Sequence, residues 1–317
     1  MYTDISIIIV NFNTTNYLKK LLNSINSNFS SIETIVVDNN STDRQIENLI
    51  DEFPGIQFHL RKINDGFGSG CNYGANKASG KYLLFLNPDI ILLDDSIIKL
   101  RMQLESEDSI GVISGFMVDK VNLPIYCFND FPSFEWEFYQ IIGYGYNRKI
   151  SELINRKEIQ ENKNFEVDWF HGAFFMLRKS DYEKIGGFNE NYFMYMEDID
   201  ICYQIQTKLK KKNICVPYVR VFHHTQSSIN NYKNDDLYSF HMTRGKLLFF
   251  QNYKYLKRKL LYLMSTISVL LRILILPIWG KYSSKRRKKF EQLVNLLKLH
   301  FDKKYLYSSK LKYLNSK

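Results

Sequence analysis

Short apolar runs rich in β-branched residues alternate with segments of helical spacing through the first third of the chain. The run at 5–10, ISIIIV, predicts a buried strand, and the segment 15–26 repeats its leucine and isoleucine residues at the spacing of one helix face. Further strands are expected at 34–38, 57–61 and 81–86, and further helices at 43–53 and 70–78. This alternation predicts right-handed βαβ units and a parallel sheet.

The rest of the chain has a less regular pattern. Strands are expected at 112–118, 168–178 and 216–222, and helices at 180–185 and 201–210. The aromatic-rich stretch 126–159 predicts loop plus helix. We therefore expect one α/β domain over 1–250, with halves at 1–110 and 111–250, followed by a helical tail at 251–317.

Polar residues and glycines follow each of the first four predicted strands. The four segments are Asn11-Phe12-Asn13, 38–43 (DNNSTD), 64–68 (NDGFG) and 87–89 (NPD). Each alone is ordinary turn chemistry, but the carboxyl ends of parallel strands share one rim of a sheet, where ligands bind. The four together predict a polar crevice, and none of them matches a P-loop or a GxGxxG pattern.

Composition narrows the class of protein. The chain has 317 residues, of which 45% are hydrophobic, which is enough to form a core and excludes wholesale disorder. The four cysteines include no CxxC pair, which argues against a zinc ribbon, a thioredoxin-like motif and a secreted disulfide scaffold. The first residues carry Asp4 and no basic cluster, so we expect no signal peptide there.

The net charge of +10 is unevenly distributed. Residues 244–317 hold 19 lysines and arginines against Glu291 and Asp302, whereas the residues before them hold 24 basic and 31 acidic side chains. A strongly basic tail on a mildly acidic body predicts contact with an anionic surface. The two candidates are nucleic acid and the inner leaflet of the plasma membrane.

The tail favours the membrane of these two candidates. Its run at 260–279, LLYLMSTISVLLRILILPIW, has nearly the length of a spanning helix and is flanked by basic residues on both sides. Arg272 would cost roughly 3 kcal/mol at the centre of a bilayer, and Pro277 would kink or end the helix. We therefore expect a helix that lies in the membrane interface rather than a span. The alternative is a buried core helix with a solvated basic collar; no nucleic-acid-binding motif is present.

The order of five segments resembles that of a known enzyme family. The segments are ISIIIVNFN, IVVDNNSTD, INDGFGSGCNYGANKASGKYLLFLNPD, VDWFHGAFFMLRKSDYEKIGGFNENYFMYMEDIDICYQI and VRVFHHTQSS. Together they resemble a family 2 glycosyltransferase of the GT-A fold, and most of all the bacterial rhamnosyltransferases that build O-antigen or capsular polysaccharide. The resemblance covers residues 3–250 and implies a Rossmann-like mixed sheet flanked by helices.

The resemblance implies a nucleotide-diphosphate sugar as donor. Asp38 would accept a hydrogen bond from a pyrimidine N3–H, and Phe12 would pack on the base. Asp65 and Gly68 replace the leucine and alanine that the family usually has near its phosphate contacts, so the sequence departs from the pattern there. The other residues that would contact the donor are Asn11, Asn13, Asn40, Asn64, Gly66, Cys71, Asn72, Asn87 and Arg244.

The resemblance also implies a divalent cation, Mg²⁺ or Mn²⁺. Asn87-Pro88-Asp89 stands where the family has its DxD metal motif, and only the last carboxylate is present. We expect Asp89 to be a ligand, because hard cations take oxygen ligands, and the resemblance implies that His223 is a second one, since it stands where many family members have a histidine that can reach the metal. The alternative for this segment is an Asn-Pro-Asp turn after a buried strand.

Glu197-Asp198 matches the family's acidic pair at the start of a helix. An inverting displacement needs a base for the proton of the acceptor hydroxyl, and the resemblance assigns that role to Asp198. Glu197 and Asp200 would orient it, and Asp200 is the alternative base. Acceptor contacts are expected at Trp169, His171, Gly172 and Ala173.

These expectations describe an inverting, metal-dependent transferase that moves a sugar to a lipid-linked glycan. The favoured donor is dTDP-rhamnose, and the favoured acceptor is a polyprenyl-diphosphate-linked oligosaccharide on the inner face of the plasma membrane, where the enzyme would bind peripherally. Two alternatives remain: a transferase that uses a UDP-hexose or UDP-N-acetylhexosamine, and a non-catalytic nucleotide-sugar-binding or scaffold protein. A nucleotidyltransferase is a weaker option, because the loop after the first strand lacks glycine and basic residues.

Overall fold

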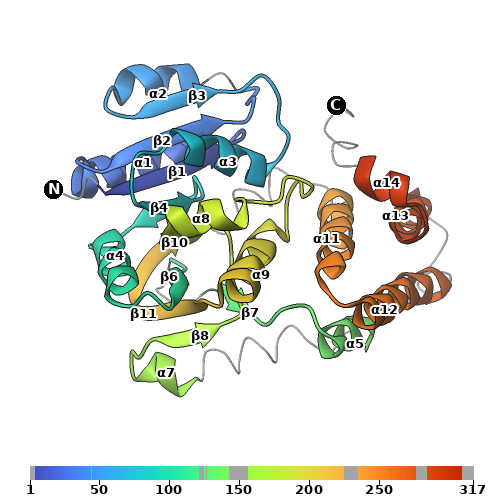
Figure 1. Ribbon diagram of the computed structural model, residues 1–317. Helices are drawn as coiled ribbons and strands as arrows, with labels where there is room; N and C mark the ends of the chain where they lie inside the picture. Colours follow the sequence, from blue (N-terminus) through green and yellow to red (C-terminus); the bar gives the residue numbers. More distant parts are fainter. Residues whose placement is uncertain are drawn as a thin grey trace. The chain divides into compact units, whose positions relative to one another are not determined.

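The computed structural model divides the chain into two compact units (Figure 1). It describes residues 4–43, 45–93, 95–120, 125, 127–142, 156–224, 235–275 and 284–308. The first unit comprises Met1–Phe131, Ile154–Glu190 and Glu197–Lys233, and the second comprises Pro132–Leu153, Asn191–Met196 and Asn234–Lys317. The domain boundary expected at residue 250 therefore does not coincide with a boundary between these units.

A nine-stranded mixed sheet forms the centre of the first unit. Eight of its strands follow the order β3-β2-β1-β4-β10-β6-β11-β5, and β8 pairs with β11. A separate two-stranded sheet pairs β7 with β9. The strands are β1 (Ile5–Asn11), β2 (Glu33–Asp38), β3 (Gln57–Leu60), β4 (Tyr82–Leu86), β5 (Ile90–Leu92), β6 (Ile110–Val118), β7 (Phe128–Asn129), β8 (Phe165–Val167), β9 (Trp169–Phe170), β10 (Phe174–Arg178) and β11 (Lys212–His223).

The first four strands are parallel, which confirms that part of the expected topology. Their register aligns Asn11 with Asp38 and Asp38 with Leu60, so the polar segments that follow these strands meet at one rim. β10 then runs antiparallel to β4 and β6, and makes the sheet mixed. The expected α/β sheet flanked by helices is confirmed.

Helices cover the sheet, and its central strands β1, β4 and β6 are therefore buried at every position. Gly70 and Gly74 let α3 approach β1 closely: a Cβ on Gly74 would lie 2.6 Å from the Ile8 side chain. The helices of this unit are α1 (Thr15–Phe29), α2 (Ile46–Glu52), α3 (Phe67–Lys77), α4 (Ser96–Ser106), α7 (Lys157–Gln160), α8 (Lys179–Ile185) and α9 (Glu197–Leu209).

Two segments differ from the sequence-based expectation. The single strand expected at 168–178 is two strands, β9 and β10, separated by a turn at residues 171–173. Asn87 N donates to Ala173 O (2.9 Å) in this turn, so a tertiary contact interrupts an otherwise apolar run. The helix expected at 201–210 begins at Glu197, which places the acidic cluster inside its first turn.

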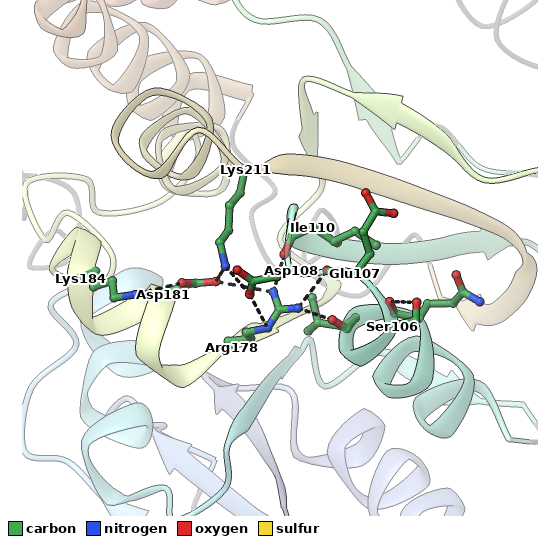
Figure 2. A network of polar contacts seen from close by, with 10 residues as sticks. Ser106, Glu107, Asp108, Ile110, Arg178, Asp181, Lys184 and Lys211 are labelled. Carbon is green, nitrogen blue, oxygen red and sulfur yellow. Dashed lines mark hydrogen bonds and ion pairs between the residues drawn. The ribbon is translucent and has the colours of Figure 1, made fainter.

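A network of buried charges lies at the end of β10 (Figure 2). The Arg178 guanidinium donates to the carbonyls of Leu104, Glu107 and Ile110, which follow or end α4. Asp181 is buried beside it, and its carboxylate lies 2.9 Å from Lys211 Nζ and 3.7 Å from Arg178 Nη1. The network therefore fixes α4, α8 and β10 to one another at the end of the strands opposite to the polar loops.

The second unit is helical, and Figure 1 draws most of it in orange and red. α11 and α12 both contact α13, and α12 also contacts α5 and η1. No helix within the described ranges is long and apolar enough to cross a membrane. Residues 276–279 of the apolar run, with Pro277, lie outside those ranges. Its elements are α5 (Phe134–Ile142), α11 (Asp235–Phe249), η1 (Phe250–Asn252), α12 (Tyr255–Ile275), α13 (Ser284–Phe301) and α14 (Lys303–Ser308).

Candidate active site

The loops after β1 and β2 are joined through the carboxylate of Asp38. Asn11 Nδ2 donates to Asp38 Oδ1 (2.7 Å), and the Ser41 hydroxyl and backbone N–H donate to its two oxygens (2.6 and 2.8 Å). A carboxylate has about four lone-pair positions, so the donors from the described part of the chain leave one position on Oδ2. Asp38 is held in one orientation and can accept one further hydrogen bond, as a pyrimidine N3–H would donate.

Two asparagines of these loops adopt left-handed backbone conformations. Asn13 has φ of 54° and Asn40 has φ of 63°, a region that asparagine tolerates better than most residues. Asn13 Oδ1 accepts from Thr42 N (2.7 Å), which ties the first loop to the second. Phe12, directly before Asn13, is half-buried. These turns place the segment 11–13 at the rim, as predicted.

The loop after β3 is held by its own side chains. Asn64 Oδ1 accepts from Gly66 N (3.1 Å), and Gly66 has φ of 111°, which favours glycine. Arg61 donates to Asn39 Oδ1 (3.0 Å) and pairs with Asp65 (2.7 Å). Asp65, one of the two departures from the family pattern, therefore serves to hold Arg61 and the loop.

Cys71 and Asn72 on α3 make contacts within the protein. Asn72 Nδ2 donates to Phe188 O (2.9 Å) and Glu190 Oε1 (2.8 Å), and its Oδ1 accepts from Phe188 N and from the Tyr182 hydroxyl. All hydrogen-bonding positions of the Asn72 side chain are thus occupied within the protein, whereas the sequence predicted that Asn72 would contact the nucleotide sugar. Cys71 is buried, and burial raises the pKa of its thiol.

Asp89 and His223 lie together, although 133 residues separate them in the sequence. The antiparallel pairing of β5 with β11 aligns Ile90 with His223 and brings His223 Nε2 to 3.3 Å from Asp89 Oδ2. His224 points away, with its ring against Phe222 and Tyr17. Asn87, at the end of β4, precedes Asp89 by two residues.

The donor atoms of this pair fit a divalent cation such as Mn²⁺. Asp89 supplies carboxylate oxygen, and His223 Nδ1 is buried without a hydrogen-bond partner among the described residues. No group of three or more histidine, cysteine or acidic side chains that could hold a metal occurs within the described ranges. The protein would therefore supply two ligands, and the remaining positions suit phosphate oxygens and water, as Mg²⁺ and Mn²⁺ sites of transferases commonly have them.

Asp198 is oriented by the turn between β9 and β10. Gly172 N donates to Asp198 Oδ2 (2.9 Å), and Ile199 N donates to Asp198 Oδ1 (2.9 Å). Burial raises the pKa of Asp198, and the neighbouring His171 and these hydrogen bonds oppose that rise. A carboxylate that is fixed in direction and more basic than usual suits a general base.

Glu197 and Asp200 flank Asp198 in the first turn of α9. Burial raises the pKa of Glu197 well above its usual range, and the nearby Asp198 adds to this rise. Its Oε2 has no hydrogen-bond partner among the described residues. Asp200 is 3% exposed and accepts from Gln204 Nε2 (3.4 Å). The structure thus brings all three acidic residues to one helix end, with Asp198 the one that faces the β9–β10 turn.

His171 lies between the acidic cluster and the Asp89–His223 pair. Its ring centroid is 6.4 Å from that of His223, and burial lowers the pKa of His171 while Asp198 and Asp89 oppose that effect. Ala173 is fully buried. Trp169 Nε1 donates to Asp130 O (2.9 Å), and its side chain is half-buried. The four residues expected on the acceptor side therefore adjoin the acidic cluster through Gly172.

We expect Gly172→Val to lower donor turnover by about 10²-fold. A Cβ at this position would lie 3.3 Å from Asp198 Cβ and 3.5 Å from Phe67 Cε1, so the two further methyl groups of valine would displace the carboxylate. Gly55→Val is the matched control, because nothing lies within 4 Å of a Cβ there. Equal turnover by both variants, measured as release of nucleoside diphosphate, would contradict the importance of this contact.

Arg244 belongs to the second unit and is 1% exposed. Its guanidinium donates to the carbonyls of Asn191 (2.8 Å), Leu306 (2.9 Å) and Tyr307 (3.4 Å), all within that unit. These contacts give it a structural role that the sequence did not suggest, in place of the expected contact with the diphosphate. Sequence analysis also missed Ser41, whose hydroxyl and backbone N–H both donate to the Asp38 carboxylate three residues earlier.

Solved structures place this fold in a known class. A mannosyltransferase from Pyrobaculum calidifontis, solved with GDP-Man and Mn²⁺, aligns with a TM-score of 0.57 over 100% of this chain and 89% of its own, at 13% identity. The structure of S. aureus TarS 1-349 aligns with a TM-score of 0.53 over 98% of this chain and 86% of its own, also at 13% identity. With its mixed sheet and polar rim, the first unit has the GT-A fold of nucleotide-sugar transferases.

The chain belongs to glycosyl transferase family 2. The model of this family matches residues 6–186, which are more than half of the sequence. The rhamnosyltransferase WbbL of Escherichia coli is 28% identical over 264 residues, which are 80% of this chain and 92% of that protein. The N-acetylglucosaminyl-diphospho-decaprenol L-rhamnosyltransferase of Mycobacterium tuberculosis is 23% identical over 62% of this chain and 68% of its own length. The resemblance stated from the sequence is thus confirmed.

Proposed function

We propose that the protein is an inverting, metal-dependent glycosyltransferase that transfers L-rhamnose from dTDP-rhamnose to a polyprenyl-diphosphate-linked oligosaccharide. The observation that carries the proposal is the half-buried Asp198, held by Gly172 N–H next to His171, whose ring lies 6.4 Å from that of His223 in the Asp89–His223 pair. Rhamnosyltransferases among the relatives support the sugar, and the decaprenol-linked substrate in the name of the mycobacterial relative supports the lipid carrier. The enzyme would act peripherally at the inner face of the plasma membrane.

In the proposed reaction, Asp198 removes the proton of the acceptor hydroxyl as its oxygen attacks C1 of the sugar. The bond between C1 and the phosphate oxygen breaks at the same time, and nucleoside diphosphate leaves with its electron pair. One displacement inverts the configuration at C1. Glu197 and Asp200 would keep Asp198 in place through the helix turn that they share, and Asp38 with its neighbours would hold the base of the nucleotide.

Asp89 and His223 would hold the divalent cation, which would neutralise negative charge on the diphosphate. Asn87 adjoins this pair and could contact the same phosphates. Asn64 and Gly66 would line the path between nucleoside and phosphates, as the resemblance implies.

We expect Asp89→Asn to weaken binding of Mn²⁺ together with dTDP by at least about tenfold, because it removes one of two protein ligands. The rise in melting temperature that Mn²⁺ and dTDP cause together measures this binding without turnover. Asp51→Asn, which alters an exposed carboxylate on α2, is the control and should respond like the unaltered protein. An undiminished shift in the Asp89 variant would rule out a metal role for this side chain.

A second candidate is the same reaction with a UDP-hexose donor. Transfer of a hexose is supported by the name of one relative, a low-salt glycan biosynthesis hexosyltransferase of Haloferax volcanii, which is 27% identical over 70% of this chain and 66% of its own length. A thermal-shift series with Mn²⁺ and dTDP-rhamnose, UDP-glucose, UDP-galactose or UDP-N-acetylglucosamine separates the two. Stabilisation by dTDP-rhamnose alone supports the proposal, and stabilisation by a UDP-sugar alone replaces its donor.

A further inference from the structure

The helix α12 buries two serines and exposes most of its leucines. Its buried positions include Ser265, which is 1% exposed, and Ser268, which is 6% exposed. Its outward positions carry large aliphatic side chains, with Leu256 exposed by 70%, Leu263 by 55% and Leu274 by 68%. An ordinary surface helix of a water-soluble unit has the opposite arrangement.

The inner face of α12 is already complete. Ser265 Oγ lies 3.0 Å from His300 Nε2 on α13, and the Tyr262 hydroxyl donates to Leu247 O (2.8 Å) on α11. Leu261 and Val269 are buried on the same side, where α12 packs against α5 and α13. The exposed leucines are therefore an additional apolar surface and not the core face of this helix.

These aliphatic side chains form one continuous row. Most of their positions follow one another at intervals of three or four residues, the spacing of a single helix face, and the adjacent Leu270 and Leu271 widen the row at one point. From Leu256 to Leu274 the row extends about 27 Å along the helix at 1.5 Å per residue. Its members are Leu256, Leu260, Leu263, Ile267, Leu270, Leu271 and Leu274, and we name this set the leucine row.

The charges around the leucine row are basic. Lys259 is exposed near one end of the row and Arg272 near the other, and α12 has no acidic residue. The start of α13, which contacts α12, exposes Arg287, Lys288 and Lys289, with Arg287 paired to Glu291. A second copy of this chain would bring equal positive charge against them, which disfavours self-association. An apolar row bordered by lysine and arginine suits an anionic lipid interface, where the side chains enter the acyl boundary and the cations meet the headgroups.

We propose that the leucine row is a membrane-docking surface that holds α12 in the plane of an anionic bilayer interface. This proposal rests on the proposed function, and it names the side chains that would hold the enzyme at the inner face of the membrane. Its test uses neither donor nor acceptor, so a failure here is distinct from a failure of the transfer chemistry.

The test is flotation of the full-length protein with vesicles. One set contains phosphatidylcholine alone, and the other contains equal parts of phosphatidylcholine and phosphatidylglycerol. We expect binding to the anionic vesicles, weaker binding to the neutral ones, and a loss of at least about tenfold in partitioning for Leu263→Glu. Met102→Glu is the matched control, because Met102 on α4 is 58% exposed and gains the same charge.

Both side chains are exposed, so neither substitution is expected to disturb the fold. The melting temperatures of the two variants verify this. The proposal is overturned if the unaltered protein does not float with anionic vesicles, or if the two variants bind them equally. It is also overturned if the protein is dimeric without lipid and Leu263→Glu makes it monomeric, because a second copy would then be the occupant. Loss of flotation with a retained donor-induced thermal shift would leave the proposed transferase standing.

Discussion

Replacement of Asp198 by asparagine is expected to lower donor turnover by about 10³-fold while donor binding stays unchanged. The amide keeps the size of the side chain but cannot take the proton of the attacking hydroxyl. Gly172 N–H and Ile199 N–H donate to the two oxygens of Asp198, so the base is already directed before any substrate binds. Release of nucleoside diphosphate measures turnover, and the donor-induced thermal shift measures binding.

The control for this substitution is Asp51→Asn on α2, which changes the same charge at an exposed position. If Asp198→Asn retains turnover within a few-fold of this control, Asp198 is not the base. Asp200 would then be tested next, because it is the alternative in the same helix turn. A simultaneous loss of the thermal shift would instead indicate that Asp198 acts through the structure of the donor site.

Replacement of Arg178 by methionine is expected to destabilise the protein by about 3–5 kcal/mol. It removes the donors of three backbone carbonyls and one of the cations beside the buried Asp181 (Figure 2). Lys211 would remain as the partner of that carboxylate at 2.9 Å, which keeps the cost below that of an isolated buried charge. Urea unfolding followed by circular dichroism measures the difference.

Lys19→Met serves as the comparison, because Lys19 pairs with Glu52 at the surface and is 48% exposed. We expect that change to cost at most about 1 kcal/mol. Equal midpoints for the two variants would show that the network around Arg178 does not stabilise the fold. Since the network lies away from Asp89 and Asp198, the folded fraction of Arg178→Met should keep its turnover per molecule.

The strand and helix pattern predicted the fold because β1, β2 and β4 are largely apolar runs that are buried along nearly their whole length. Prediction failed at 168–178, where Ala173 O accepts from Asn87 N and Gly172 N donates to Asp198. Those partners are distant in sequence, and the local sign of the turn was Gly172 within the strand pattern. β5 and α4 were also missed, although Ile97, Leu100 and Leu104 of α4 have helical spacing.

The candidate site was predicted in part by the resemblance and not by spacing. Asp89 and His223 were proposed as a pair from motif positions, and the β5–β11 register now brings them to 3.3 Å. Asn72 and Arg244 were assigned to the donor by the same motifs, yet their polar atoms bond to Phe188 and to backbone carbonyls. A motif identifies a residue type, whereas the partners that occupy its hydrogen bonds depend on the folded chain.

The most direct measurement for the proposed function is release of nucleoside diphosphate from each of four donors in the presence of Mn²⁺. The donors are dTDP-rhamnose, UDP-glucose, UDP-galactose and UDP-N-acetylglucosamine, and slow hydrolysis needs no acceptor. The account predicts release of dTDP from dTDP-rhamnose alone, and loss of that release in Asp198→Asn. Stabilisation by a donor without release from any of them, in the presence of anionic vesicles as well, would contradict it and indicate a nucleotide-sugar-binding protein without transferase activity.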